Sequence, residues 1–131
     1  MIDLHLHTTA SDGALAPAVL VARAASAGIT TLAVTDHDTT GGLDEARSAA
    51  EARGLRLVNG IEITAVEGTR DVHVLGYFFD PADSALRSFL EEQSEDRIRR
   101  VKEMAEQLAL LGAAIDPDPI VRQGRATGRS F

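Results

Sequence analysis

Residues 2–7, near the start of the chain, read Ile2-Asp3-Leu4-His5-Leu6-His7. Apolar and polar residues alternate strictly here, and this period of two is typical of a β-strand. Ile2, Leu4 and Leu6 fall on one face of the strand, and Asp3, His5 and His7 fall on the other. We therefore expect a strand that directs two imidazoles to the same point.

Helical and strand signals alternate from this stretch to residue 79. Pro17 suits the first turn of a helix that Gly28 ends, and residues 43–53 are an alanine-rich helical segment closed by Gly54. Strand signals lie at residues 31–35, 55–58 and 72–79, with a further candidate at 61–65. This order favours an α/β fold with a parallel sheet and right-handed crossovers.

The pattern changes after Phe79. Residues 84–111 carry the apolar stripe of one long helix or of two shorter helices, which Gly112 ends. Residues 116–119 (Asp-Pro-Asp-Pro) indicate a loop, and residues 124–131 show no periodicity. Three or four strands cannot close a barrel, which needs about eight. We therefore expect these 131 residues to be part of a larger protein.

Composition excludes several classes of protein. The chain has 44% hydrophobic and 25% charged residues and no cysteine, which rules out disulfide scaffolds, cysteine-bound zinc and thiol catalysis. It has no apolar run of about 18 residues and no signal-peptide pattern, so we expect a cytoplasmic protein without a membrane partner. A net charge of −7 argues against binding of duplex DNA. It allows a phosphorylated substrate, because bound divalent cations would reverse the local charge.

All four histidines lie at or near predicted strands, with carboxylates beside them. The six candidate metal ligands are His5, His7, Asp12, His37, Glu62 and His73. Ligands gather at the carboxyl ends of parallel strands, so His5, His7 and His37 can converge there. Imidazole nitrogen and carboxylate oxygen without sulfur suit Mn²⁺, Zn²⁺ or Fe²⁺, and six ligands favour two or more ions. Such a cluster lowers the pKa of a water molecule and holds phosphoryl oxygens.

Several of these residues also have an ordinary structural interpretation. A strand histidine such as His73 is more often a core residue than a ligand, and Asp12 alone is typical of a turn. Asp3, Asp36 and Asp38 would orient the imidazoles through hydrogen bonds, or would serve as helix caps or solvated charges. The joint placement of all four histidines favours the metal site.

These stretches resemble the opening motifs of the PHP (polymerase and histidinol phosphatase) family. The matching motifs are Asp3-Leu4-His5-Leu6-His7-Thr8, Ser11-Asp12-Gly13, Thr35-Asp36-His37-Asp38, Gly60-Ile61-Glu62 and His73-Val74-Leu75-Gly76-Tyr77. The resemblance implies a distorted (β/α)₇ barrel that binds up to three divalent metals, manganese above all, and hydrolyses phosphoesters. Residues 1–80 would be the amino-terminal part of that barrel, and residues 81–131 a helical insertion, incomplete at its carboxyl end.

The same resemblance implies roles for the six ligands. His5, His7 and Glu62 would hold one metal, and Glu62 would bridge to a second metal with His73. Asp12 and His37 would serve a third metal and lie beside the substrate. The later histidine motifs of the family and its terminal Asp-x-His pair have no counterpart in this chain. Each metal would therefore lack at least one ligand here.

The motif spacing is most similar to stand-alone bacterial members that act on nucleoside 3′,5′-bisphosphates or on the 5′ ends of short single-stranded RNA. Arg97, Arg99 and Arg100 would bind a second phosphate of such a substrate, and Arg122, Arg125 and Arg129 are weaker candidates. The alternative for this cluster is a solvated helix face paired with neighbouring acids. Alternatives for the whole chain are a histidinol-phosphate-type phosphatase, a structural or proofreading module of a DNA polymerase, and an inactive fragment.

Overall fold

The computed structural model describes residues 1–68 and 70–122, and the chain divides into two compact units, residues 1–83 and 84–131. The first unit contains a four-stranded sheet and two helices, α1 and α2. The second contains the helices α3 and α4 among its described residues.

The sheet of the first unit has the strand order β1-β2-β3-β4. Its strands are β1 (Ile2–Leu6), β2 (Thr31–Val34), β3 (Arg56–Glu67) and β4 (Arg70–Tyr77). The first three pair in parallel, as the sequence predicts, but β4 pairs antiparallel to β3. The expectation of a wholly parallel sheet is wrong for β4, because a short turn rather than a crossover helix joins it to β3.

Strand β3 unites two stretches that the sequence analysis treats as separate strands. Residues 55–58 and 61–65 fall almost entirely within its 12 residues. Gly60 lies between them, where a Cβ atom would stand 2.8 Å from the carbonyl oxygen of Val34 on β2. Glycine here therefore allows close approach of the two backbones, not a break in the strand.

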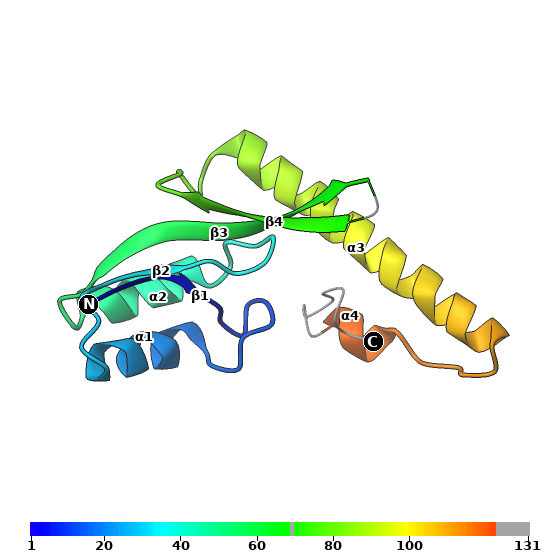
Figure 1. Ribbon diagram of the computed structural model, residues 1–131, viewed down its shortest axis with the longest axis horizontal. Helices are drawn as coiled ribbons and strands as arrows, with labels where there is room; N and C mark the ends of the chain where they lie inside the picture. The colour runs from blue at the N-terminus through cyan, green and yellow to red at the C-terminus, as the bar shows by residue number, and fades with distance from the viewer. Residues whose placement is uncertain (69, 123–131) are drawn as a thin grey trace. The chain divides into compact units, whose positions relative to one another are not determined.

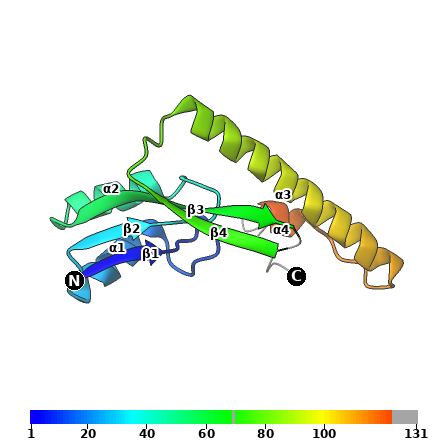
Figure 2. The ribbon, with the colours of Figure 1, turned by 45° about the horizontal axis from the view of Figure 1, so that its top comes forward.

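Helices α1 (Pro17–Ser26) and α2 (Leu43–Glu51) lie side by side on one face of the sheet (Figures 1 and 2). With β2 they enclose the core, which is a cluster of buried residues comprising Val21, Ala24, Ile29, Leu32, Val34, Leu43, Ala46, Ala49 and Ala50. Of the apolar face predicted for β1, Leu6 packs against this core, whereas Ile2 and Leu4 are exposed. The predicted apolar face is therefore only partly buried.

The sheet is strongly curled. The hydroxyl of Tyr77 on β4 donates a hydrogen bond of 2.8 Å to the carbonyl oxygen of Leu4 on β1, although two strands separate β4 from β1 in the sheet order. A flat sheet would hold these edges about 14 Å apart, since neighbouring strands lie about 4.8 Å from one another. The first unit is thus a curled half-barrel sheet of the mixed α/β class.

The second unit begins with the single long helix α3 (Ser84–Leu110), so the stripe at residues 84–111 is one helix. Gly112 follows with φ +84°, a value that favours glycine at the end of a helix. The loop expected at residues 116–119 is wrong in its second half, because the short helix α4 (Asp118–Arg122) begins at Asp118. Its proline lies in the first turn, where a missing N–H costs nothing. Residues 124–131 lie outside the described part of the chain.

Candidate metal centre

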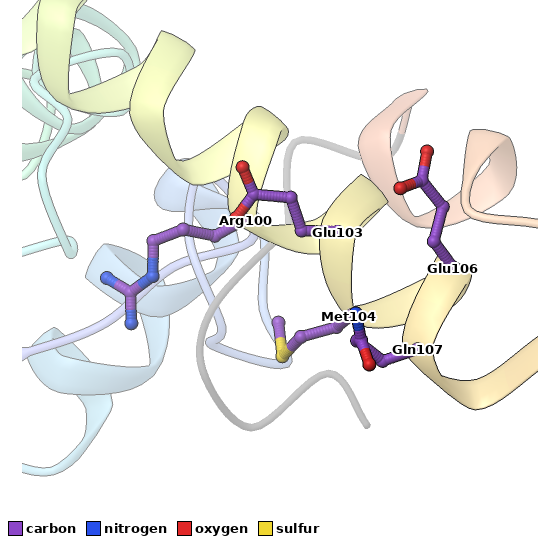
Figure 3. Close-up of a pocket in the computed structure, with 5 residues that line it drawn as sticks. All are labelled: Arg100, Glu103, Met104, Glu106 and Gln107. Carbon is purple, nitrogen blue, oxygen red and sulfur yellow. The ribbon is translucent and has the colours of Figure 1, made fainter. Parts of the chain in front are cut away.

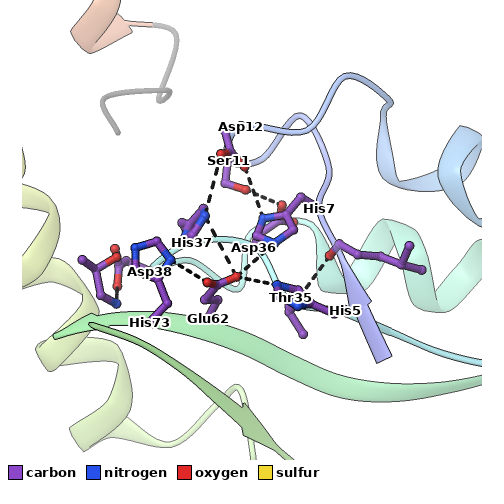
Figure 4. Close-up of polar contacts among 12 residues, drawn as sticks. His5, His7, Ser11, Asp12, Thr35, Asp36, His37, Asp38, Glu62 and His73 are labelled. Atoms are coloured by element: carbon purple, nitrogen blue, oxygen red, sulfur yellow. Dashed lines mark hydrogen bonds and ion pairs between the residues drawn. The ribbon is translucent and has the colours of Figure 1, made fainter. Parts of the chain in front are cut away.

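The six candidate ligands come together at one end of the curled sheet (Figure 4). His5 lies on β1 and His7 just after it, and Asp12 lies in the loop that follows. The segment after β2 carries His37, which bridges to β3 at Glu62 in parallel register. His73 comes from β4. Six side chains from four strands and their loops therefore converge. The rule that ligands gather at the ends of parallel strands applies to His5, His7 and His37, but not to Glu62 and His73, which lie within β3 and β4.

Glu62 lies at the centre of this cluster. Its residue is only 4% exposed, yet three imidazoles contact its carboxylate. Oε2 lies 2.8 Å from Nε2 of His5 and 3.0 Å from Nε2 of His7. Oε1 lies 2.6 Å from Nδ1 of His73. Both carboxylate oxygens are therefore engaged, one on each side, which is the arrangement a bridging ligand needs.

Asp12 forms the second carboxylate of the cluster. Its Oδ1 lies 3.2 Å from Nδ1 of His7, and its Oδ2 lies 3.7 Å from Nε2 of His37. The His7 nitrogen is buried and forms no hydrogen bond, even though the carboxylate is this close. A buried ring nitrogen without a hydrogen-bond partner is costly for a purely structural histidine, whereas a metal ligand needs that nitrogen free.

The ligand atoms fall into three groups, within each of which they lie no more than 4.8 Å apart. The groups are His5–His7–Glu62, His7–Asp12–His37 and His37–Glu62–His73. His7, His37 and Glu62 each belong to two groups. This donor set fits divalent ions that accept nitrogen and oxygen ligands. The pairing of Asp12 with His37 agrees with the expected third site, and His7 joins it.

Burial and charge act on the pKa values of two members. Burial raises the pKa of the Glu62 carboxyl, but hydrogen bonds from His5 and His73 and the charge of nearby imidazoles outweigh it and hold the pKa below its ordinary value. Burial lowers the pKa of His37, against the opposing effect of Glu62 and Asp12. Glu62 is therefore kept ionised and His37 neutral, which are the forms that ligate metals.

The carboxylates of Asp3, Asp36 and Asp38 bind backbone and hydroxyl groups. Asp3 accepts the backbone N–H of His5, and the Oδ1 atom of Asp38 accepts the backbone N–H of Thr64 on β3. Asp36 is 1% exposed and accepts three hydrogen bonds from Thr8 and Ser11. Asp36 and Asp38 are buried, so neither is a solvated charge. They hold the polypeptide that carries the ligands.

The sequence analysis did not single out Thr8 or Ser11 as site residues. Both are buried, at 0% and 2% exposure. Small hydroxyl residues in a loop look like solvated turn formers, and their burial depends on a partner 25 or 28 residues further along the chain. The one available signal was that both flank the ligands His7 and Asp12 in the sequence.

The arginines proposed for substrate binding lie on α3, in the second unit. Arg99 pairs with Asp96 at 2.8 Å and lies 3.7 Å from Glu103, as on a solvated helix face. Arg100 lines a cavity of about 420 Å³ on α3, together with Glu103, Met104, Glu106 and Gln107 (Figure 3). Arg122 lies in α4, and Arg125 and Arg129 lie outside the described residues. Among the described residues, no helix is long and apolar enough to cross a membrane.

Comparison with family models identifies the chain. A model of the PHP domain matches residues 3–114, which include all six candidate ligands. The chain belongs to the PHP domain family. This PHP domain also resembles curated bacterial proteins. It is 44% identical over 113 residues to the 3′,5′-nucleoside bisphosphate phosphatase of Chromobacterium violaceum, and 40% identical over 131 residues to the 5′-3′ exoribonuclease Rnm of Escherichia coli.

Those alignments cover 86% and 97% of this PHP domain but only 40% and 45% of the two relatives. The chain therefore spans less than half the length of the curated relatives that it matches. A solved structure from Bifidobacterium adolescentis, described as a metal-dependent phosphoesterase, superimposes with a TM-score of 0.83 at 39% identity. That match covers 98% of this chain and 44% of the other. The half-barrel is thus a fold seen in related proteins.

Proposed function

We propose that this PHP domain is part of a metal-dependent phosphoesterase that hydrolyses phosphate monoesters of nucleotides, either nucleoside 3′,5′-bisphosphates or the 5′ ends of short single-stranded RNA. The observation that carries the proposal is the buried carboxylate of Glu62 in contact with three imidazoles, beside a second carboxylate-imidazole group at Asp12. The names of the two curated relatives support the substrate class.

The charges of the site explain why cations are required. Glu62 and Asp12 bring two negative charges to the place where a phosphate would bind, and without cations they would repel it. Divalent ions, when bound, offset that charge and lower the pKa of a water molecule towards neutrality. We propose manganese, with zinc or iron as alternatives, because the donors are nitrogen and oxygen.

The chain's own residues supply the positioning. Glu62 would hold two ions through its two oxygens, which His5 and His7 contact on one side and His73 on the other. Asp12 and His37 would hold a further ion together with His7. We further propose that residues 81–131 form an insertion between parts of the barrel.

The test is phosphate release by the intact protein with Mn²⁺, from adenosine 3′,5′-bisphosphate and from a short 5′-phosphorylated RNA. Wild-type protein is expected to release phosphate, and Glu62→Gln to lose at least about 100-fold of that rate. Glu67→Gln makes the same chemical change at an exposed position of the same strand and serves as the control. Absence of hydrolysis of both substrates by metal-loaded wild-type protein would overturn the proposal.

A further inference from the structure

The loop between β1 and α1 is wound around the buried residue Thr8. The carbonyl oxygen of Thr8 accepts the backbone N–H groups of Ser11 and Gly13, at 3.1 and 2.8 Å. Its hydroxyl oxygen also accepts the N–H of Ala10 at 3.1 Å. Asp12 lies inside this winding, between Ser11 and Gly13. The position of the Asp12 carboxylate therefore depends on how Thr8 and Ser11 are held.

Asp36 holds both residues from the end of β2. Its Oδ1 accepts the backbone N–H of Thr8 at 2.7 Å and the hydroxyl of Ser11 at 2.6 Å. Its Oδ2 accepts the Thr8 hydroxyl at 2.6 Å. All three residues are buried, so these bonds are shielded from water and strong. We refer to Thr8, Ser11 and Asp36 together as the latch.

Two glycines make room for the latch. A Cβ atom on Gly42 would stand 2.9 Å from Oδ2 of Asp36 and 3.0 Å from Oγ1 of Thr8. A Cβ atom on Gly13 would stand 2.3 Å from the carbonyl oxygen of His7 and 2.6 Å from the backbone nitrogen of Thr8. Real Cβ atoms essentially never show contacts below 3.0 Å, and a contact of 3.0 Å is tighter than nine in ten. Glycine is therefore needed at positions 13 and 42, because a Cβ atom at either position would displace the atoms of the latch or the backbone beside it.

The latch connects the segments that follow β1 and β2, and these segments carry the three ligands of one group. His7 directly precedes Thr8, Asp12 directly follows Ser11, and His37 directly follows Asp36. We propose that Asp36 is a positioning residue which, through Thr8 and Ser11, sets Asp12 against His7 and His37. Because Asp12 belongs to the His7–Asp12–His37 group only, we expect Asp36 to affect metal binding at that group and not at the other two. This inference rests on the proposed function for its purpose, but its test reads metal binding and not hydrolysis.

The test is Mn²⁺ titration of the intact protein by calorimetry, with ions counted per chain. Thr8→Val keeps the size of the side chain but removes its hydroxyl, and is expected to weaken one class of Mn²⁺ site by about 10–100-fold. Thr8→Ser retains the hydroxyl, and this variant is expected to bind Mn²⁺ as the wild type does. Ser11→Ala removes one of the three bonds and is expected to cause a smaller loss at the same class of site.

Double variants that combine Thr8→Val with the loss of a ligand distinguish a positioning role of the latch from an effect on overall stability. In the Asp12→Ala background, Thr8→Val is expected to cause no further loss of Mn²⁺ affinity, whereas in the His73→Ala background its effect is expected in full. Val21→Ala, a buried change in α1, controls for lowered stability and is expected to leave all Mn²⁺ affinities unchanged.

Two results would overturn the inference. One is equal weakening of every class of site by Thr8→Val and Ser11→Ala, and the other is wild-type Mn²⁺ binding by both variants. If Thr8→Val does not fold, the same comparison with Ser11→Ala decides between these outcomes. Normal Mn²⁺ binding without hydrolysis of any phosphoester would refute the proposed function and leave the latch intact.

Discussion

Nδ1 of His73 lies 2.6 Å from Oε1 of Glu62, although the two residues belong to different strands and are not paired across them. Their partners are displaced by two positions, since Glu62 pairs with Leu75 and His73 with Thr64. Diagonal neighbours in an antiparallel pair remain within reach of long side chains. The antiparallel turn between β3 and β4 therefore brings the fourth histidine to the carboxylate that β1 also reaches.

His73→Ala tests the His37–Glu62–His73 group of ligands. His73 belongs to one ligand group only, so its loss is expected to weaken one class of Mn²⁺ site by about 10–100-fold and to spare the His7–Asp12–His37 group. Calorimetric titration measures the affected class. Uniform loss at every site would contradict the grouping.

Asp38 is expected to tolerate asparagine but not alanine. Its φ of +51° is in the left-handed region, and its Oδ1 accepts the N–H of Thr64 at 2.7 Å. Asparagine adopts this backbone and keeps an acceptor, whereas alanine has no acceptor and is strained there. Urea unfolding is expected to show Asp38→Ala about 2 kcal/mol less stable, with Asp38→Asn within about 1 kcal/mol of the wild type. Equal stability of the two variants would refute this account.

Gly13→Ala and Gly41→Ala form a matched pair in neighbouring loops. At Gly13 the added methyl group would meet backbone at 2.3 Å, whereas at Gly41 the nearest atom is the Thr39 hydroxyl at 3.3 Å. Gly13→Ala is expected to lower the free energy of unfolding by about 3 kcal/mol, and Gly41→Ala by less than about 1 kcal/mol. Thermal or urea unfolding of both variants measures the difference. Similar losses of stability in the two variants would show that the short contacts at Gly13 do not constrain the backbone.

Acidification is expected to destabilise the metal-free protein in two stages. Burial lowers the pKa of His37 below 6.5, so the unfolded state binds more protons than the folded state just below that pH. The stability contributed by neutral His37 is therefore present above pH 6.5 and is lost as pH falls through the folded pKa. Glu62, whose pKa is also lowered, contributes a further loss that begins below pH 4.5.

Urea unfolding of the metal-free protein between about pH 5 and 8 isolates the first stage. His37→Gln removes the titrating group and is expected to flatten the decline in stability below pH 6.5. An unchanged pH profile in that variant would show that His37 is not the group responsible.

The parallel part of the fold could be predicted because its signals are local. The strict alternation of residues 2–7, the helix beginning at Pro17 and the glycines after both helices each depend on near neighbours in the sequence. The convergence of His5, His7 and His37 could be expected from the rule that ligands gather at the ends of parallel strands. The six ligand candidates therefore could be chosen before their distances were known.

The rest depends on contacts between distant parts of the chain. The direction of β4 depends on its antiparallel pairing with β3, and residues 61–65 continue β3 through Gly60 because that glycine packs against β2. Asp36 binds Thr8 across 28 residues, and no sequence period indicates such a bond. The exposure of Ile2 and Leu4 was equally invisible, since alternation shows a face but not what covers it.

We propose that this chain's own residues hold divalent ions around Glu62. The most direct measurement is the metal content per chain after loading with Mn²⁺ and dialysis, compared between wild type, Glu62→Gln and the exposed control Glu67→Gln. We expect the wild type and Glu67→Gln to retain more than one ion per chain, and Glu62→Gln to lose most of it, because Glu62 belongs to two of the three groups. Equal metal content in all three proteins, or none in the wild type, would contradict the claim.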